Sequence, residues 1–209
     1  KDIAVGYYHT LFVTDLGEVY ATGYNNYGQL GDGTTTQRTT PVKVAINKTV
    51  SKVFCTASSN ESSYFLTEDG EVYACGYNGQ GQLGTGNSSN VSTPTLVLLD
   101  EKIVDIACGD THVLFLAQSS KVFVCGKNDT NQLGTATGGN KQTPEESIIN
   151  NTTRVRRIFA GKKNSFFLTE NYALYAIGEN NNGELGQGNT SNLSTLTEIQ
   201  KEYAPAIFN

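Results

Sequence analysis

The two histidines of this sequence are its most obvious candidates for proton transfer near neutral pH, and they share one place in a repeated pattern. His9 and His112 each begin a run of apolar residues, where Ser62 and Asn164 stand in the other two copies. A hydrolytic triad needs a histidine beside a nucleophile and a carboxylate. Because the position also accepts Ser and Asn, we expect a repeated hydrogen-bonded turn there. The sequence therefore predicts no catalytic residue and no enzyme activity.

Metal and cofactor sites are not indicated by the remaining reactive groups. The four cysteines form no CxxC pair, and they are Cys55, Cys75, Cys108 and Cys125. Zinc sites draw on closely spaced ligand pairs, whereas Cys75 and Cys125 share a repeat position with Thr22 and Ile177, which is typical of packing. The glycine-rich loops lack the Lys and Ser/Thr of a phosphate-binding loop. We predict no metal, no cofactor, no disulfide between Cys75 and Cys125, and buried thiols typical of a reducing compartment.

Two groups of side chains are not explained by the repeat pattern, and they are the candidate partner-binding residues. Aromatic residues in loops are enriched at protein interfaces, and the loops of the first two repeats carry Tyr7, Tyr8, Tyr24, Tyr27 and Tyr77. Basic residues can meet an acidic partner, and the fourth repeat carries Arg154, Arg156, Arg157, Lys162 and Lys163. The alternatives are tyrosines that pack on their own loops and a solvated basic edge.

These residues are set in a fourfold repeat. A stretch beginning Gly-Tyr-Asn and containing Gln-Leu-Gly starts at Gly23 and returns, with variations, at Gly76, Gly126 and Gly178, at spacings of 53, 50 and 52 residues. A period of about 50 is typical of a propeller or an array. The single leucine of each stretch predicts a plug that packs the loop onto its sheet, and these leucines are Leu30, Leu83, Leu133 and Leu185.

Each repeat is predicted to contain four short strands. The second strands, 9–14, 62–67, 112–117 and 164–169, are apolar on both faces, which predicts cover on both faces. Glycine before the second strand, as at Gly6, suits a positive φ. The turn after it contains Gly17 or Gly70 in two repeats, and Ser120 and Tyr172 predict different turns in the others. Fourth strands are expected after proline, at 42–46, 95–99 and 145–149, and at 193–199 in the last repeat.

The predicted fold is all-β: a β-propeller of four-stranded antiparallel blades, with no helix before Lys201. A single domain is expected over residues 1–209, with blades at about 1–50, 51–101, 102–153 and 154–209. The sequence starts inside a repeat and contains no Met. We therefore expect a piece of a longer chain.

The repeated stretches of this chain resemble the repeat of the regulator of chromosome condensation family. The first repeat matches the family pattern through Gly6, His9, Thr10, Gly17, Val19, Tyr20, Gly23, Asn25, Gly28, Gln29, Leu30, Gly31 and Gly33. The second repeat lacks the leading glycine and histidine, and the fourth has Asn164 for His and Glu184 for Gln. The resemblance implies a ring that closes with seven blades, of which four are present.

Three functions from different classes follow. The first is a non-enzymatic protein-interaction scaffold within a larger protein. The resemblance implies two alternatives, a guanine-nucleotide exchange factor for a small GTPase and a chromatin-associated regulator. The net charge of −5 argues against nucleic acid as a partner, and no apolar run is long enough to span a membrane. We expect protein partners, a small GTPase or a large assembly among them, and an intracellular location, cytoplasmic or nuclear.

Overall fold

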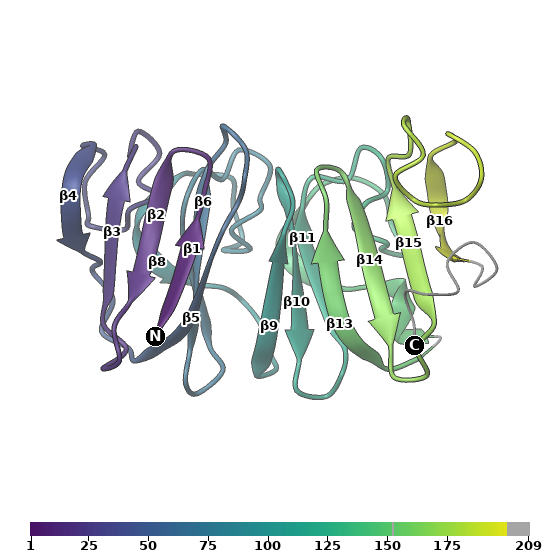
Figure 1. Cartoon of the computed structure of the whole chain (residues 1–209), viewed down its shortest axis with the longest axis horizontal. Coiled ribbons are helices and arrows are strands. Elements are labelled where there is room, and N and C mark those ends of the chain that lie inside the picture. The colour runs from purple at the N-terminus through teal and green to yellow at the C-terminus, as the bar shows by residue number, and fades with distance from the viewer. Residues whose placement is uncertain (152, 200–209) are drawn as a thin grey trace.

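The computed structural model describes residues 1–151 and 153–199. These residues form four antiparallel four-stranded sheets, each made of strands consecutive in the sequence. The first sheet contains β1 (Asp2–Val5), β2 (His9–Val13), β3 (Val19–Gly23) and β4 (Arg38–Lys43). The second contains β5 (Val50–Cys55), β6 (Ser62–Thr67), β7 (Val72–Gly76) and β8 (Val91–Leu96). The all-β fold of four-stranded blades is confirmed (Figure 1).

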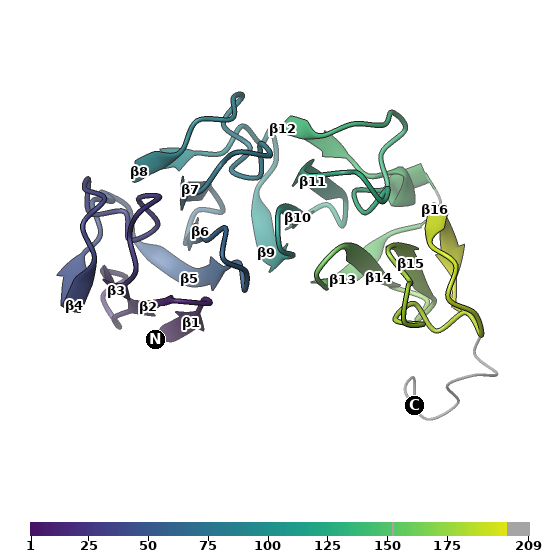
Figure 2. The same cartoon turned by 90° about the horizontal axis from the view of Figure 1, so that it is seen from above.

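The third and fourth sheets repeat this order. The third contains β9 (Ile103–Cys108), β10 (His112–Ala117), β11 (Val122–Gly126) and β12 (Lys141–Glu146). The fourth contains β13 (Val155–Ala160), β14 (Asn164–Thr169), β15 (Leu174–Gly178) and β16 (Leu193–Glu198). The blades follow one another in an open arc (Figure 2), with β5, β9 and β13 toward its inner side and β8, β12 and β16 toward its outer side. Closure into a seven-bladed ring stays a prediction.

The hydrophobic core lies between blades. One cluster joins the first and second blades through Leu11 and Phe65, and another joins the third and fourth through Leu114 and Phe167. These four side chains, all in second strands, are fully buried. Every residue of β6 and β10 is buried, because both strands have a blade on each side. In β2 and β14 burial alternates over the apolar run, because these strands belong to the blades at the ends of the arc.

The long loop after each third strand is organised by asparagine. Asn25 Oδ1 accepts a hydrogen bond from the amide of Leu30 at 2.9 Å, and Asn25 Nδ2 donates to the carbonyls of Thr34 and Thr36, each at 3.1 Å. Asn78, Asn128 and Asn180 accept the same bond from the leucine five residues on. The side-chain amide of the asparagine thus joins the two ends of the loop and holds the leucine backbone where its side chain is buried. The predicted plugs are confirmed, since all four leucines are fully buried.

Two expectations about the fourth strands were wrong. The fourth strands of the first three blades begin three residues before Pro41, Pro94 and Pro144, so the proline lies inside the strand. These strands lie at the outer edge of their sheets, where a missing N–H removes no ladder bond. A one-turn 3₁₀ helix, η1 (Ile148–Asn151), occupies the end of the expected strand 145–149.

The turn after each second strand has one geometry in all four blades. Ser120 and Tyr172 have φ of 69° and 63°, close to the 76° and 85° of Gly17 and Gly70. Each of these residues donates its amide to the carbonyl three residues back. The expectation of different turns was therefore wrong, and two side chains are held in a left-handed conformation that ordinarily favours glycine.

Candidate protein-interaction site

The five loop tyrosines form one continuous chain of ring contacts, which we call the tyrosine surface (Tyr7, Tyr8, Tyr24, Tyr27 and Tyr77). Successive rings have centroid separations of 4.4, 6.0, 6.1 and 5.2 Å and meet edge to face. Such pairs stabilise each other by about 0.5–1.5 kcal/mol beyond area burial. The chain of rings crosses from the first blade to the second, because Tyr77 follows β7 whereas the other four follow β1 and β3.

The tyrosine surface is partly open to solvent. Tyr7 and Tyr8 are 57% and 58% exposed, and the other three rings are half-buried. Each ring therefore packs on a neighbouring tyrosine and still presents part of its area. The structure thus combines the two alternatives that the sequence left open, packing among loops and an exposed aromatic group. Whether a partner uses this surface stays a prediction.

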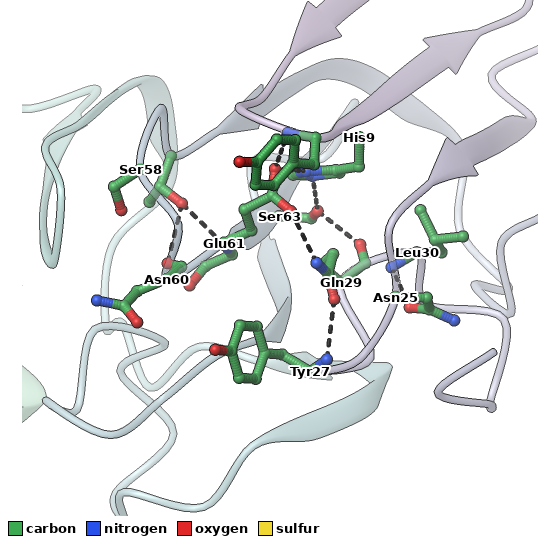
Figure 3. A network of polar contacts seen from close by, with 12 residues as sticks. His9, Asn25, Tyr27, Gln29, Leu30, Ser58, Asn60, Glu61 and Ser63 are labelled. Atoms are coloured by element: carbon green, nitrogen blue, oxygen red, sulfur yellow. Dashed lines mark hydrogen bonds and ion pairs between the residues drawn. The ribbon is translucent and has the colours of Figure 1, made fainter. Parts of the chain in front are cut away.

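A buried carboxylate lies beneath the tyrosine surface, at the boundary between the first two blades. Glu61 Oε1 accepts from His9 Nδ1 at 2.9 Å, and Glu61 Oε2 accepts from Gln29 Nε2 at 2.9 Å (Figure 3). Glu61 is fully buried and His9 is 2% exposed. Burial alone raises the pKa of Glu61, but hydrogen bonds from His9, the Tyr8 amide and Gln29 outweigh it, so the pKa is lowered. We call this set, with Ser63, the Glu61 clasp.

The Glu61 clasp has the connectivity of a hydrolytic triad without its chemistry. His9 Nε2 lies 2.8 Å from Ser63 Oγ, and Ser63 Oγ lies 2.6 Å from the Gln29 carbonyl. A carbonyl only accepts, so the single proton of Ser63 points to the Gln29 carbonyl and away from His9 Nε2. The serine proton is therefore not available to His9, and the arrangement lacks the serine-to-histidine proton transfer of a triad. Ser63 is also fully buried, so the arrangement fastens blades together.

The Glu61 clasp also holds the main chain under the tyrosine surface. The Tyr8 amide donates directly to Glu61 Oε1. The Tyr27 amide donates to Gln29 Oε1 at 3.0 Å, and Gln29 in turn donates to Glu61 (Figure 3). One carboxylate of the second blade therefore fixes two tyrosines of the first blade through their backbone.

The other junctions lack an equivalent of Glu61, since Thr111 and Lys163 occupy its repeat position. Between the third and fourth blades, His112 Nε2 lies 3.1 Å from Ser165 Oγ, but His112 Nδ1 has no hydrogen-bond partner among the described residues. Burial lowers the pKa of His112 to about 4, and the nearby backbone of Asn164 opposes this only in part. Gln82 Nε2 is likewise unpartnered within the described ranges. The complete network is found beneath the tyrosine surface.

The expected role of the histidines needs a correction. His9 and His112 bond across a blade boundary instead of within their own turn. Ser62 and Asn164, at the same repeat position, donate within their own blade to the carbonyls of Tyr77 and Glu179.

The glycine that precedes each histidine needs a correction as well. Gly6 does not have a positive φ. A Cβ there would lie 2.5 Å from His9 Nδ1, so close approach of the ring requires glycine.

The basic residues do not form one patch. Arg154 lies beside Glu170 before β13 begins, and Lys162 and Lys163 follow the other end of that strand. Between them, Arg156 packs on the Tyr172 ring at 5.2 Å and Arg157 on the Phe159 ring at 5.1 Å. Lys162 and Lys163 pair with acids, at 4.0 Å to Asp110 and 3.5 Å to Glu179. The structure thus distributes these charges along a whole strand, which favours the tyrosine surface as the better assembled candidate.

Across residues 1–151 and 153–199, no three His, Cys, Asp or Glu side chains gather as metal ligands. The four cysteines are free, and burial raises the pKa of the Cys75 and Cys125 thiols. No helix in the described part of the chain has the length and apolarity to cross a membrane.

Sequence reasoning missed Glu61 and Ser63 as partners of His9, and Gln29 as a partner of Glu61. The available signal was a separation of one repeat, since His9 and Ser63 are 54 residues apart. Glu61 was also the acidic exception at a position held by Tyr8, Thr111 and Lys163 elsewhere. Only the packing of adjacent blades shows that these residues meet.

The chain is similar to segments of much larger proteins. Probable E3 ubiquitin-protein ligase HERC4 of Homo sapiens is 31% identical over 206 residues, which cover 97% of this chain and 20% of that protein. X-linked retinitis pigmentosa GTPase regulator of Homo sapiens is 40% identical over 103 residues, which cover 49% of this chain and 10% of that protein. The chain therefore spans a fifth or less of these two relatives.

Solved structures and a family profile agree with the repeat. The crystal structure of human WBSCR16 superposes with a TM-score of 0.80 at 26% identity, covering 95% of this chain and 52% of that one. The profile of the RCC1-like domain matches residues 1–207. With its blades, its repeated loops and this match over nearly its whole length, the chain belongs to the family of RCC1-like domains.

Proposed function

We propose that this domain is a non-enzymatic protein-interaction module, part of a larger scaffold, and that it binds a partner protein through the tyrosine surface. The observation that carries the proposal is the unbroken contact of five tyrosine rings across two blades. Blade packing occupies the strands, so loops and outer edges remain for a partner. Tyrosine combines a large apolar ring, few rotatable bonds and a hydroxyl, and therefore loses little entropy on docking.

The absence of catalysis is part of the same proposal. The one triad-like arrangement found in the described chain, Ser63–His9–Glu61, is buried and its serine proton is engaged with a carbonyl. An intracellular setting, cytoplasmic or nuclear, is supported by the free thiols, which persist in reducing compartments. The net charge of −5 disfavours chromatin as a partner.

Site-specific photo-crosslinking tests the interaction. A benzophenone amino acid in place of Tyr24 is expected to capture a discrete partner from cell extract, whereas the same amino acid in place of Tyr172, in the turn between β14 and β15, captures none. A Tyr24→Ala/Tyr27→Ala/Tyr77→Ala variant with an unchanged melting temperature is expected to recover the wild-type partner at least tenfold less well. Equal recovery by this variant would move the interface away from the tyrosine surface.

Nucleotide exchange on a small GTPase is a second candidate, favoured by the 40% identity to a protein named as a GTPase regulator. The four long loops, residues 24–37, 77–90, 127–140 and 179–192, are equal in length, so none of them carries an insertion that the others lack. We therefore expect no acceleration of GDP release from small GTPases by this chain. A rate increase proportional to its concentration would favour exchange over scaffolding.

A further inference from the structure

We propose that the tyrosine surface receives an extended, uncharged, proline-rich segment of the partner. This inference rests on the proposed function and names the chemistry of the partner. Aromatic-lined grooves bind polyproline II segments in several unrelated domains, because the preformed helix loses little entropy when it docks.

Charge is the first argument. The loop segments that carry or adjoin the tyrosine surface, residues 6–8, 24–31, 56–60 and 77–84, contain no Asp, Glu, Lys or Arg. Glu61, the next residue, is fully buried and engaged with His9 and Gln29. A phosphate-bearing or strongly charged ligand would find no counter-charge here, so single-stranded nucleic acid is disfavoured. The surface instead offers tyrosine rings, tyrosine hydroxyls and side-chain amides. These groups suit a ligand that is apolar and has carbonyl oxygens to accept hydrogen bonds.

The shape of the surface is the second argument. Interplanar angles of 77°, 62°, 77° and 66° turn each ring nearly perpendicular to the next. Rings that alternate in this way present faces and edges in turn. A polyproline II helix carries pyrrolidine rings that can pack on such faces, at three residues per turn and a rise of about 3.1 Å per residue. The carbonyl groups of that helix make no internal hydrogen bonds and can accept from tyrosine hydroxyls.

Preorganisation is the third argument. Tyr8 and Tyr27 are held through their amides by Glu61 and Gln29, and the rings support one another in sequence. The surface is thus formed before a ligand arrives, and a rigid ligand meeting a rigid site loses little entropy on binding. The Glu61 clasp is found under this group of exposed aromatics and under no other junction of the described blades.

Tyrosine-selective NMR tests the inference directly. The full chain carries 11 tyrosines, so ring-labelled protein gives a readable spectrum. The probe is a capped polyproline peptide of about ten residues, long enough for three turns. Titration is expected to shift the resonances of the tyrosine surface and to saturate below about 2 mM, a weak but specific affinity. Tyr20 and Tyr172, outside the surface, serve as internal controls, and a Gly-Ser peptide of equal length is expected to shift nothing.

Variants and a second ligand decide between outcomes. Tyr77→Ala is expected to weaken polyproline binding at least tenfold, whereas Tyr172→Asn, which keeps a residue suited to its φ of 63°, leaves binding unchanged. If polyproline shifts no tyrosine resonance, the inference is overturned. It is also overturned if an uncharged oligosaccharide shifts these resonances and polyproline does not. If polyproline fails while the triple tyrosine variant still loses its crosslinked partner, the proposed function stands without this ligand. If partner recovery is unaffected by that variant, the proposed function itself fails.

Discussion

His9 of the first blade and Glu61 of the second lie 52 residues apart in sequence and 2.9 Å apart in space, both buried. The pair lies between two blades and directly below the exposed tyrosines. It links the stability of the blade boundary to the geometry of the candidate binding surface.

The pair is predicted to be energetically coupled. Removing one partner of a buried hydrogen bond typically costs about 1–3 kcal/mol, and more where a charged group is involved, because the other partner is left unsatisfied. Glu61→Gln and His9→Gln are each expected to lower the free energy of unfolding by that order, and the double variant to lose at least about 1 kcal/mol less than their sum. Urea unfolding of the wild type, the two single variants and the double variant measures this coupling. The exposed pair Lys43–Glu18, at 2.6 Å, is the control, and a coupling there as large as at the clasp would contradict the assignment.

Acid is predicted to destabilise the fold through His112. Its pKa falls from 6.5 to about 4 on folding, so the folded state resists protonation. The contribution of neutral His112 is complete above pH 6.5 and is lost as the pH falls toward 4, by on the order of 3 kcal/mol. Denaturant unfolding at several pH values is expected to show a flatter profile for His112→Asn, the residue that blade four has at this position. Parallel profiles would refute the assignment.

Glu61 is predicted to lose its contribution to stability at a lower pH than His112 does. Its folded pKa is lowered, so its stabilising contribution is present above the unfolded value of 4.5 and disappears as the pH falls through the folded pKa. Comparing wild type with Glu61→Gln, we expect the stability difference between them to be constant from pH 7 to about 5 and to shrink below that. A difference that shrinks already at neutral pH would show that another group governs the boundary.

Core packing between blades is predicted to dominate stability. Leu114 is fully buried between the third and fourth blades, whereas Leu16 is 80% exposed in a turn. Leu114→Ala is expected to cost about 2–5 kcal/mol because it leaves a cavity, and Leu16→Ala less than about 0.5 kcal/mol. Thermal and urea unfolding give both values. Similar losses for the two variants would be inconsistent with a core located between blades.

The buried thiols are predicted to be inert in the native state. Cys75 and Cys125 are fully buried, and burial raises the pKa of both thiols, which suppresses the reactive thiolate. Iodoacetamide is expected to label both only after unfolding. A Leu16→Cys variant supplies an exposed thiol that reacts at once. Rapid native labelling of Cys75 or Cys125 would show that the blade boundary opens.

The sequence by itself determined what depends on neighbours along the chain. The repeat of about 50 residues, the second strands and the leucine plugs follow from apolar periodicity and from glycine and asparagine at fixed loop positions, because those patterns act over a few residues. The blade architecture could be predicted for the same reason, since each sheet consists of consecutive strands.

Only the tertiary structure decided which residues meet across blades. The partners of His9, the chain of tyrosine rings and the distribution of the basic residues along β13 depend on how one sheet packs on the next, at separations of about one repeat. The close approach of His9 to Gly6 follows from the same contact. Local patterns carry no information about a neighbour some 50 residues away, whereas blade packing places its side chain within hydrogen-bonding distance.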